Sequence, residues 1–391
     1  MQTAVRDKHI NSLPSIFVSF LLLSFHAILV IYINSTFLEQ FIPASRVGLI
    51  FAAGSLLSIA ILFIAPWLIK KIGMYYLTIA MLLLEFFFVG TLAFTKVTTI
   101  ILVFFILYRG VVASLFYFFD LFLESASKVE SKTGRIRGLY LALANTVVII
   151  SPTLAGLLLG ENHFERVYIV SALFVIPVLL IVIRNFKNES ANIESPLGVL
   201  KAVPHFVRNK NLRGVLFART LLQFFYAWMV VYTPVYLYQH MGFDWKEIGF
   251  MFTIMLMPFA LFQFPAGYLA DKKYGEKEIL IFGFIVMSLA TIGFSLVDIP
   301  NFLLITIILF LTRVGASLVE IMTESYFFKK VDEDNSNIIS IFRATGPIGY
   351  LVGLLIGSLV LYLYSFQILF ALLGVIMLFG VYFTVGIKDT K

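Results

Sequence analysis

The residues of this sequence whose types could do chemistry are charged side chains placed inside long apolar runs. Arg109 and Arg313 each lie near the middle of such a run, and a charge near the centre of a bilayer costs at least ~2.5–3.5 kcal/mol, so it normally faces a cavity or a partner. Glu320 and Glu324 follow Arg313 at spacings that return to nearly the same helix face. A buried carboxylate there can carry protons, and we predict this role for Glu320. We expect Glu324 to pair with loop lysines. We expect the arginines either to bind an anionic group or modulate a proton site, or to pair with carbonyls.

Polar residues in other apolar runs are also candidates. Histidine titrates near neutrality, and for His26 we weigh a place on a proton pathway against a hydrogen-bonded structural role. Glu85 lies in the middle of its run, and the sequence assigns it no role. Gln223, Tyr226 and Trp228 share one run. Aromatic rings there could line a cavity for an amphipathic or cationic organic solute, or could serve packing alone.

Other catalytic chemistry has no support in the sequence. Cysteine is absent, which excludes disulfides, thiolate metal sites and cysteine nucleophiles. The patterns GxxxxGKS/T, HExxH and GxSxG do not occur, and no cluster of histidines and carboxylates has metal spacing. We therefore expect no enzymatic activity, no cofactor, no metal and no ATP-driven transport by this chain alone.

The apolar runs have the length and composition of transmembrane helices. Hydrophobic residues make up 60% of the 391 residues and charged residues 13%, and a helix needs about 20 mostly apolar residues to cross the hydrocarbon core. We predict an all-α polytopic membrane protein in two six-helix halves, 1–183 and 212–391, joined by a polar linker, 184–211. The twelve expected spans lie near residues 15–36, 47–69, 74–95, 98–120, 137–160, 166–183, 212–238, 246–270, 277–297, 301–324, 338–360 and 366–386.

Lysine and arginine predict the orientation of these spans, because positively charged loops stay in the cytoplasm. The two termini and every second loop carry most of these residues, and the opposite loops hold only Arg46, Lys96, Arg166 and Lys246. Both termini are therefore expected in the cytoplasm. The same distribution accounts for the net charge of +7 without a nucleic-acid partner.

The two halves repeat each other in sequence. The motif VGLIF at 47–51 matches IGFMF at 248–252, Arg109 matches Arg313, and LAGLLLG at 154–160 matches LVGLLIG at 351–357. The matches come in the same order at nearly one spacing. A parallel repeat of this kind predicts pseudo-symmetric halves with a substrate cavity between them near the bilayer midplane.

One loop carries a resemblance to a known family. The segment GYLADKKYGEK at 267–277 resembles the loop signature of the major facilitator superfamily, which usually has one residue fewer between the aspartate and the following glycine. Its symmetry mate, PWLIKKIG at 66–73, is degenerate, with Lys70 where the acidic residue belongs. Arg109 resembles the family's arginine of the fourth span, and SPTLAG at 151–156 is similar to the Gly-Pro motif of its antiporters.

The resemblance implies roles for several of these residues. Gly267, Asp271, Lys272 and Gly275 would form a gating loop, with Asp271 facing the start of the fifth span and Arg135 and Arg137 as extra partners. The alternative is a solvated turn. Bends in the fifth and eleventh spans, or packing positions, are expected at Pro152, Gly156, Pro347 and Gly353.

These observations favour a secondary active transporter that moves a small organic solute by alternating access. We expect proton coupling, a monomer, and a plasma (inner) membrane of bacterial type. The short loops and the Pro-Gly pattern tilt the expectation slightly toward drug-type export by an antiporter. An uncoupled facilitator or a solute sensor with the same fold is the alternative.

Overall fold

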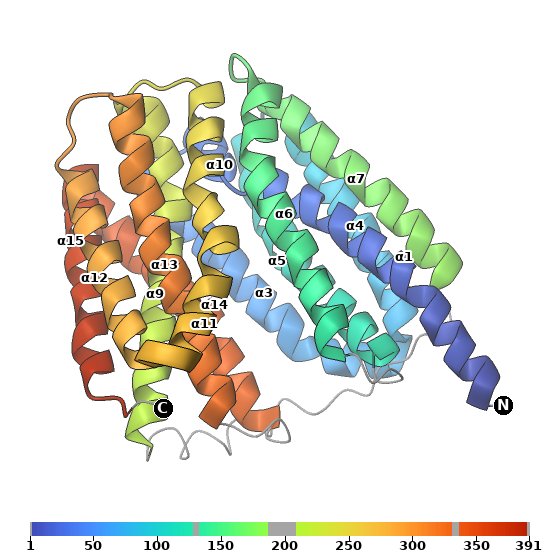
Figure 1. The fold of residues 1–391 in the computed structure, drawn as a ribbon. Coiled ribbons are helices and arrows are strands. Elements are labelled where there is room, and N and C mark those ends of the chain that lie inside the picture. Colours follow the sequence, from blue (N-terminus) through green and yellow to red (C-terminus); the bar gives the residue numbers. More distant parts are fainter. Residues whose placement is uncertain (1, 128–132, 187–208, 331–335, 389–391) are drawn as a thin grey trace. The chain divides into compact units, whose positions relative to one another are not determined.

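The computed structural model describes residues 2–127, 133–186, 209–330 and 336–388, and every regular element in this part of the chain is helical (Figure 1). The helices group into two compact units. Unit 1 contains residues 1–41 and 50–196, and unit 2 contains residues 42–49 and 197–391. We describe each unit by itself.

Unit 1 is built from long helices that pack side by side. Helix α1 packs against α5, α6 and α7, and α4 packs against α5 and α7. The elements are α1 (Gln2–Leu29), α2 (Asn34–Glu39), α3 (Ala44–Ile72), α4 (Met74–Phe94), α5 (Thr98–Ser127), α6 (Thr133–Leu159) and α7 (Phe164–Asn185).

Unit 2 repeats this style of packing. Helix α12 packs against α13 and α15, and α9 packs against α13, α14 and α15. The elements are α9 (Lys210–Val235), the π-helical turn η1 (Tyr236–His240), α10 (Trp245–Leu261), α11 (Gln263–Leu269), the π-helical turn η2 (Ala270–Tyr274), α12 (Glu276–Ser295), α13 (Phe302–Lys330), α14 (Ser336–Leu363) and α15 (Phe366–Val385).

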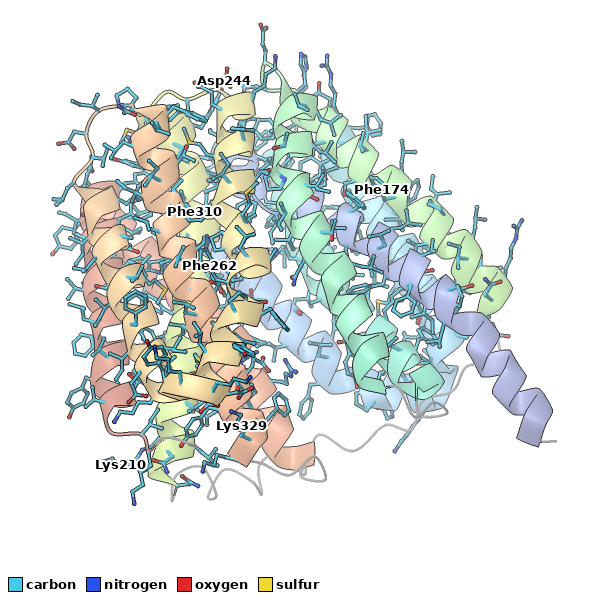
Figure 2. The ribbon with its side chains drawn as sticks, viewed as in Figure 1. Phe174, Lys210, Asp244, Phe262, Phe310 and Lys329 are labelled. Carbon is cyan, nitrogen blue, oxygen red and sulfur yellow. The ribbon has the colours of Figure 1, made fainter. Side chains whose placement is uncertain are left out.

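The helices have the length and surface of membrane spans. In the described residues ten helices are long and apolar enough to cross a bilayer, and two shorter apolar helices cover Leu13–Leu29 and Leu143–Leu159. Large apolar side chains such as Phe63, Phe264 and Phe379 are exposed. Figure 2 shows side chains projecting outward from the helices. Surfaces of this kind are stable in lipid and not in water, so the protein is a multi-pass membrane protein.

Two expected spans are interrupted in the structure. The first span was predicted to run to residue 36, but α1 ends at Leu29 and a turn leads into the short α2. The eighth span, predicted near 246–270, lies within one apolar span of Trp245–Tyr274, and Phe262 is a one-residue break in the helix between α10 and α11. Pro265 explains the second break, because its ring clashes with the carbonyl four residues before it and it has no N–H to donate.

Close helix contacts depend on glycine at a few positions. A Cβ atom on Gly315 of α13 would lie 2.5 Å from the carbonyl oxygen of Gly283 in α12. A Cβ on Gly353 of α14 would lie 2.9 Å from the Cβ of Ala227 in α9. Helix α14 runs unbroken through Pro347 to Leu363, and α6 runs unbroken through Pro152 and Gly156 to Leu159. Because α14 is unbroken at Gly353 and this glycine lies against Ala227, its contact supports a role in helix packing and not in a bend.

Candidate functional site

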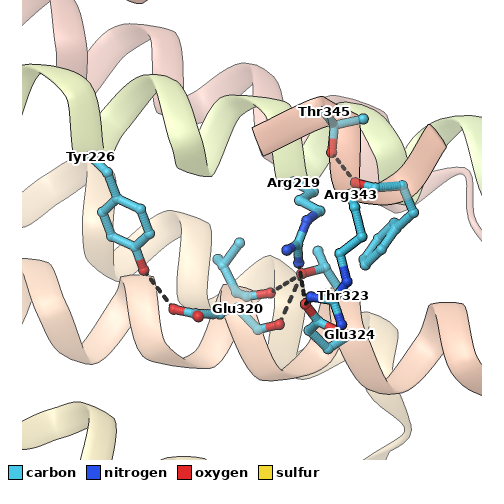
Figure 3. Close-up of polar contacts among 9 residues, drawn as sticks. Arg219, Tyr226, Glu320, Thr323, Glu324, Arg343 and Thr345 are labelled. Atoms are coloured by element: carbon cyan, nitrogen blue, oxygen red, sulfur yellow. Dashed lines mark hydrogen bonds and ion pairs between the residues drawn. The ribbon is translucent and has the colours of Figure 1, made fainter. Parts of the chain in front are cut away.

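The two carboxylates Glu320 and Glu324 of α13 face α9. The hydroxyl of Tyr226 in α9 donates a hydrogen bond to Oε2 of Glu320 at 2.8 Å (Figure 3). Glu320 is half-buried, and no ion pair to it is recorded among the described residues. Its carboxyl group therefore accepts a hydrogen bond from a neutral donor, the hydroxyl of Tyr226.

Glu324, one turn further along α13, has a different environment. Its Oε1 accepts from Nη1 of Arg219 in α9 at 2.5 Å and from Nη1 of Arg343 in α14 at 3.2 Å (Figure 3). The guanidinium of Arg219 also lies 4.3 Å from the ring centroid of Phe342. We expected loop lysines as partners of Glu324, and this was wrong, because arginines of two neighbouring helices reach it instead.

Arg313 lies deep in unit 2. Its side chain is 1% exposed, and its guanidinium carbon lies 5.2 Å from the ring centroid of Phe225 and 5.7 Å from that of Tyr226. Nη1 has no hydrogen-bond partner among the described residues. Tyr226 thus contacts both Arg313 and Glu320, because its ring lies near the guanidinium of Arg313 and its hydroxyl binds Glu320.

Arg109 of α5 is in a similar environment in unit 1. Its guanidinium carbon lies 5.1 Å from the ring centroid of Phe51 in α3, and its Nε has no partner in the described part of the chain. A Cβ on Gly54 would lie 2.6 Å from the Cβ of Arg109, so α3 and α5 approach closely here. Both symmetry-related arginines therefore stack on aromatic rings and keep one guanidinium nitrogen without a partner.

His26 pairs with Glu85, the residue to which the sequence assigned no role. Nε2 of His26 lies 2.8 Å from Oε1 of Glu85, and both side chains are fully buried. Nδ1 of His26 lies 3.0 Å from the carbonyl oxygen and 2.9 Å from the hydroxyl of Ser171 in α7. Equal depth could have suggested this pair, because each residue lies eleven positions after the cytoplasmic start of its expected span.

The aromatic run of α9 divides between the site and the core. Trp228 is fully buried, and its indole N–H donates to the carbonyl oxygen of Gly353 at 2.6 Å, which favours the packing alternative. Gln223 is half-buried beside Gly349. Tyr226 contacts Arg313 and Glu320 of α13, as described above.

The gating-loop residues form a compact structure within unit 2. Lys329 of α13 binds Asp271 at 2.5 Å and also pairs with Glu276 at the start of α12. Lys272 lies over the ring of Tyr268, with its Nζ 4.6 Å from the centroid. Gly267 belongs to α11, and Gly275 ends the turn at φ +82°. The side chains of Arg135 and Arg137, the partners expected for Asp271, lie outside the described residues.

The extra residue of this loop has a structural explanation. The amide of Gly275 donates to the carbonyl oxygen of Ala270 at 3.0 Å, which is the i→i+5 bond of a π-helical turn. Such a turn holds one more residue than an α-helical turn. Residues 270–274 therefore absorb the extra residue between Asp271 and Gly275 and keep Asp271 within reach of Lys329.

Comparisons with known proteins agree with this architecture. The sequence model of the family described as Major Facilitator Superfamily matches residues 12–257 and 234–390. No curated protein matches the sequence. The crystal structure of an auto-inhibited POT family peptide transporter has a TM-score of 0.77 at 12% identity, covering 97% of this chain and 98% of that one. The nucleoside transporter NupG has a TM-score of 0.77 at 12% identity, covering 97% of this chain and 100% of that one. At these identities the likeness shows the fold alone.

Proposed function

The chain belongs to the major facilitator superfamily, and from this premise we propose that it is a secondary active transporter, coupled to protons through Glu320, that moves a small organic solute by alternating access. The peptide and nucleoside transporters of similar fold support transport of small solutes in general. The parallel repeat supports halves 1–183 and 212–391 as the two moving bodies, with 184–211 as their linker.

The contrast between Glu320 and Glu324 carries the coupling proposal. Protonation of Glu324 would remove the charge that holds Arg219 and Arg343. Protonation of Glu320 disturbs one hydrogen bond, and Tyr226 can keep donating to an oxygen of the neutral acid. Glu320 is therefore the carboxylate of α13 that can gain and lose a proton without breaking an ion pair.

The remaining pathway residues follow from their contacts. Arg109 and Arg313 each keep a guanidinium nitrogen without a recorded partner, which suits an anionic group on the solute or a charge that changes during the cycle. Tyr226 and Gln223 complete the proposed pathway. His26 and Trp228 were candidates as well, but their full burial and satisfied polar atoms support structural roles instead.

The cellular setting is also part of the proposal. The distribution of lysine and arginine supports a plasma (inner) membrane protein with both termini in the cytoplasm. The Pro-Gly pattern at Pro152 and Gly156 favours drug-type export by an antiporter. We propose a monomer, with the Asp271–Lys329 pair ordering the gating loop.

The first test is transport by purified protein in proteoliposomes. A panel of organic cations, sugars and organic anions is presented with and without a pH gradient, for wild type, Glu320→Gln and Glu324→Gln. We expect uphill movement of at least one compound in wild type and its loss in Glu320→Gln, with solute exchange retained because the cavity is unchanged. Glu324→Gln removes the negative charge that pairs with two arginines and should instead lower the free energy of unfolding, by about 1–3 kcal/mol.

The alternatives give different results in the same assay. Equilibrating flux that ignores the pH gradient and is unchanged in Glu320→Gln would replace coupled transport with a facilitator. Binding without flux would indicate a solute sensor. Loss of uphill movement in Glu324→Gln at normal stability, with Glu320→Gln unaffected, would move the proton to Glu324.

A further inference from the structure

The contacts of the buried pair His26–Glu85 in unit 1 indicate where its protons lie. The pair and its partner Ser171 come from three helices, with His26 near the end of α1, Glu85 in the middle of α4 and Ser171 in α7. The hydrogen bonds around Ser171 fix the positions of the protons. The hydroxyl of Ser171 donates to the carbonyl oxygen of His26 at 2.8 Å, so its one hydrogen is used and its oxygen offers only lone pairs to Nδ1.

This arrangement determines the tautomer of His26. Nδ1 faces two acceptors, the hydroxyl oxygen and the carbonyl oxygen of Ser171. A carbonyl oxygen can only accept, so the hydrogen bond between Nδ1 and the Ser171 carbonyl requires a hydrogen on Nδ1. The other ring nitrogen, Nε2, then meets Oε1 of Glu85 at 2.8 Å. A contact of that length needs one hydrogen between the two atoms, either on the carboxyl group or on the imidazole.

Both placements of that hydrogen leave the pair with no net charge. Glu85 and His26 are either both neutral or oppositely charged. Loss of the proton would leave a carboxylate oxygen against the lone pair of Nε2, and a second proton would leave an unbalanced cation in a site with no exposed surface. We propose that His26 and Glu85 share one proton between Nε2 and Oε1, that this shared proton ties α1 to α4 and α7, and that the pair does not release it during transport.

Few ionisable groups of the described helices pack around the pair. Helix α5 brings the ring of Tyr108, whose centroid lies 6.3 Å from that of His26, and Arg109, whose charge acts on Glu85. Helix α7 also brings Tyr168, whose hydroxyl is bound to Asn34. Helix α6 brings no ionisable side chain over its described residues 143–159.

The position along α1 gives the site a structural purpose. α1 ends at Leu29, three residues after His26, and the last four carbonyl groups of a helix have no partner within it. The Ser171 hydroxyl satisfies one of them, at His26. The pair therefore fixes the end of α1, where the chain turns toward α2, and this role is independent of Glu320 and of the coupling proposal.

The test uses the full-length protein and needs no solute. In ¹⁵N-histidine NMR, assigned with His26→Phe among the five histidines, we expect His26 to keep a protonated Nδ1 and unchanged shifts from about pH 5 to about pH 9. Titration of His26 within that range would overturn the proposal, because the site would then exchange its proton.

A matched pair of variants provides an independent measurement. In Glu85→Gln the amide carries a permanent hydrogen to Nε2, so melting temperature and uphill transport should both match wild type. In Glu85→Leu the hydrogen bond is lost at similar volume, and the melting temperature should fall by several degrees. Equal destabilisation by both variants would overturn the proposal. So would a stable Glu85→Gln protein that keeps solute exchange and loses proton-driven movement, because the proton would then be a transported one.

Discussion

At the scale of single residues, burial and partners divide chemically identical side chains into different roles. Glu324 is held by two arginines, Glu320 by a tyrosine hydroxyl, and Glu85 by a histidine. The sequence located each charge in an apolar run but predicted few of the partners. An apolar helix in lipid has no hydrophilic face to define its rotation, so the contact between Glu85 and His26 could not be derived from spacing on either helix alone.

Glu39 at the end of α2 shows the effect of burial without a counter-charge. Burial raises the pKa of its carboxyl group from 4.5 to about 7, and its Oε2 has no hydrogen-bond partner in the described residues. Between these two values the folded state keeps a proton that the unfolded state has lost. The free energy of unfolding should therefore be highest at acidic pH, fall as pH rises through this window, and level off above about pH 7.

Melting temperature followed from pH 4.5 to pH 8 tests this behaviour. Glu39→Gln removes the ionisable group, so its melting temperature should change less over the window and exceed that of wild type at pH 8. Glu161→Gln, at an exposed carboxylate in the turn after α6, is the control and should follow wild type. Parallel curves for wild type and Glu39→Gln would contradict the prediction.

At the scale of helices, apolar length predicted where elements occur, and local chemistry decided how they end. The expected spans coincide with helices over most of their length. The break at Phe262 and the π-helical turn at 270–274 were not predicted. Pro265 gave a signal for the break, and the extra residue between Asp271 and Gly275 gave one for the turn, but neither signal specifies which helical geometry absorbs it.

Helix contacts also depend on which glycines face a neighbour. Gly315→Ala places a Cβ 2.5 Å from both the Gly283 carbonyl oxygen and the backbone nitrogen of Met287, so α12 and α13 must separate. We expect the free energy of unfolding to fall by roughly 1–3 kcal/mol, the usual cost of overpacking.

Gly293→Ala is the matched control in α12, because nothing lies within 4 Å of the added Cβ. Alanine there should be neutral or stabilise the helix by roughly 0.5–1 kcal/mol. Thermal unfolding in detergent measures both. Similar effects of the two substitutions would show that the close contact is not what makes Gly315 sensitive.

At the scale of the whole molecule, the sequence repeat carries different ionisable groups in its two copies. The repeat aligns Arg109 with Arg313, and both lie over aromatic rings. At the same spacing Glu320 aligns with Phe116, so the first half has no carboxylate at that position. Its mid-depth carboxylate is Glu85, enclosed with His26. The exchangeable proton is therefore proposed for the second half, and a fixed one for the first.

The orientation of this repeat in the membrane can be tested directly, because the chain has no cysteine of its own. Single cysteines at Glu161, Asp298 and Asn192 can be labelled with a membrane-impermeant maleimide in cells that express the protein. The first two replace exposed residues of turns between helices, after α6 and after α12. The third lies in the linker 184–211, which is rich in lysine and arginine.

Because positively charged segments stay in the cytoplasm, Glu161→Cys and Asp298→Cys should be labelled in intact cells, and Asn192→Cys only after the membrane is opened. Labelling of Asn192→Cys alone in intact cells would reverse the orientation. Opposite results for Glu161→Cys and Asp298→Cys would contradict the parallel repeat, because the two halves would then not cross the membrane in the same order.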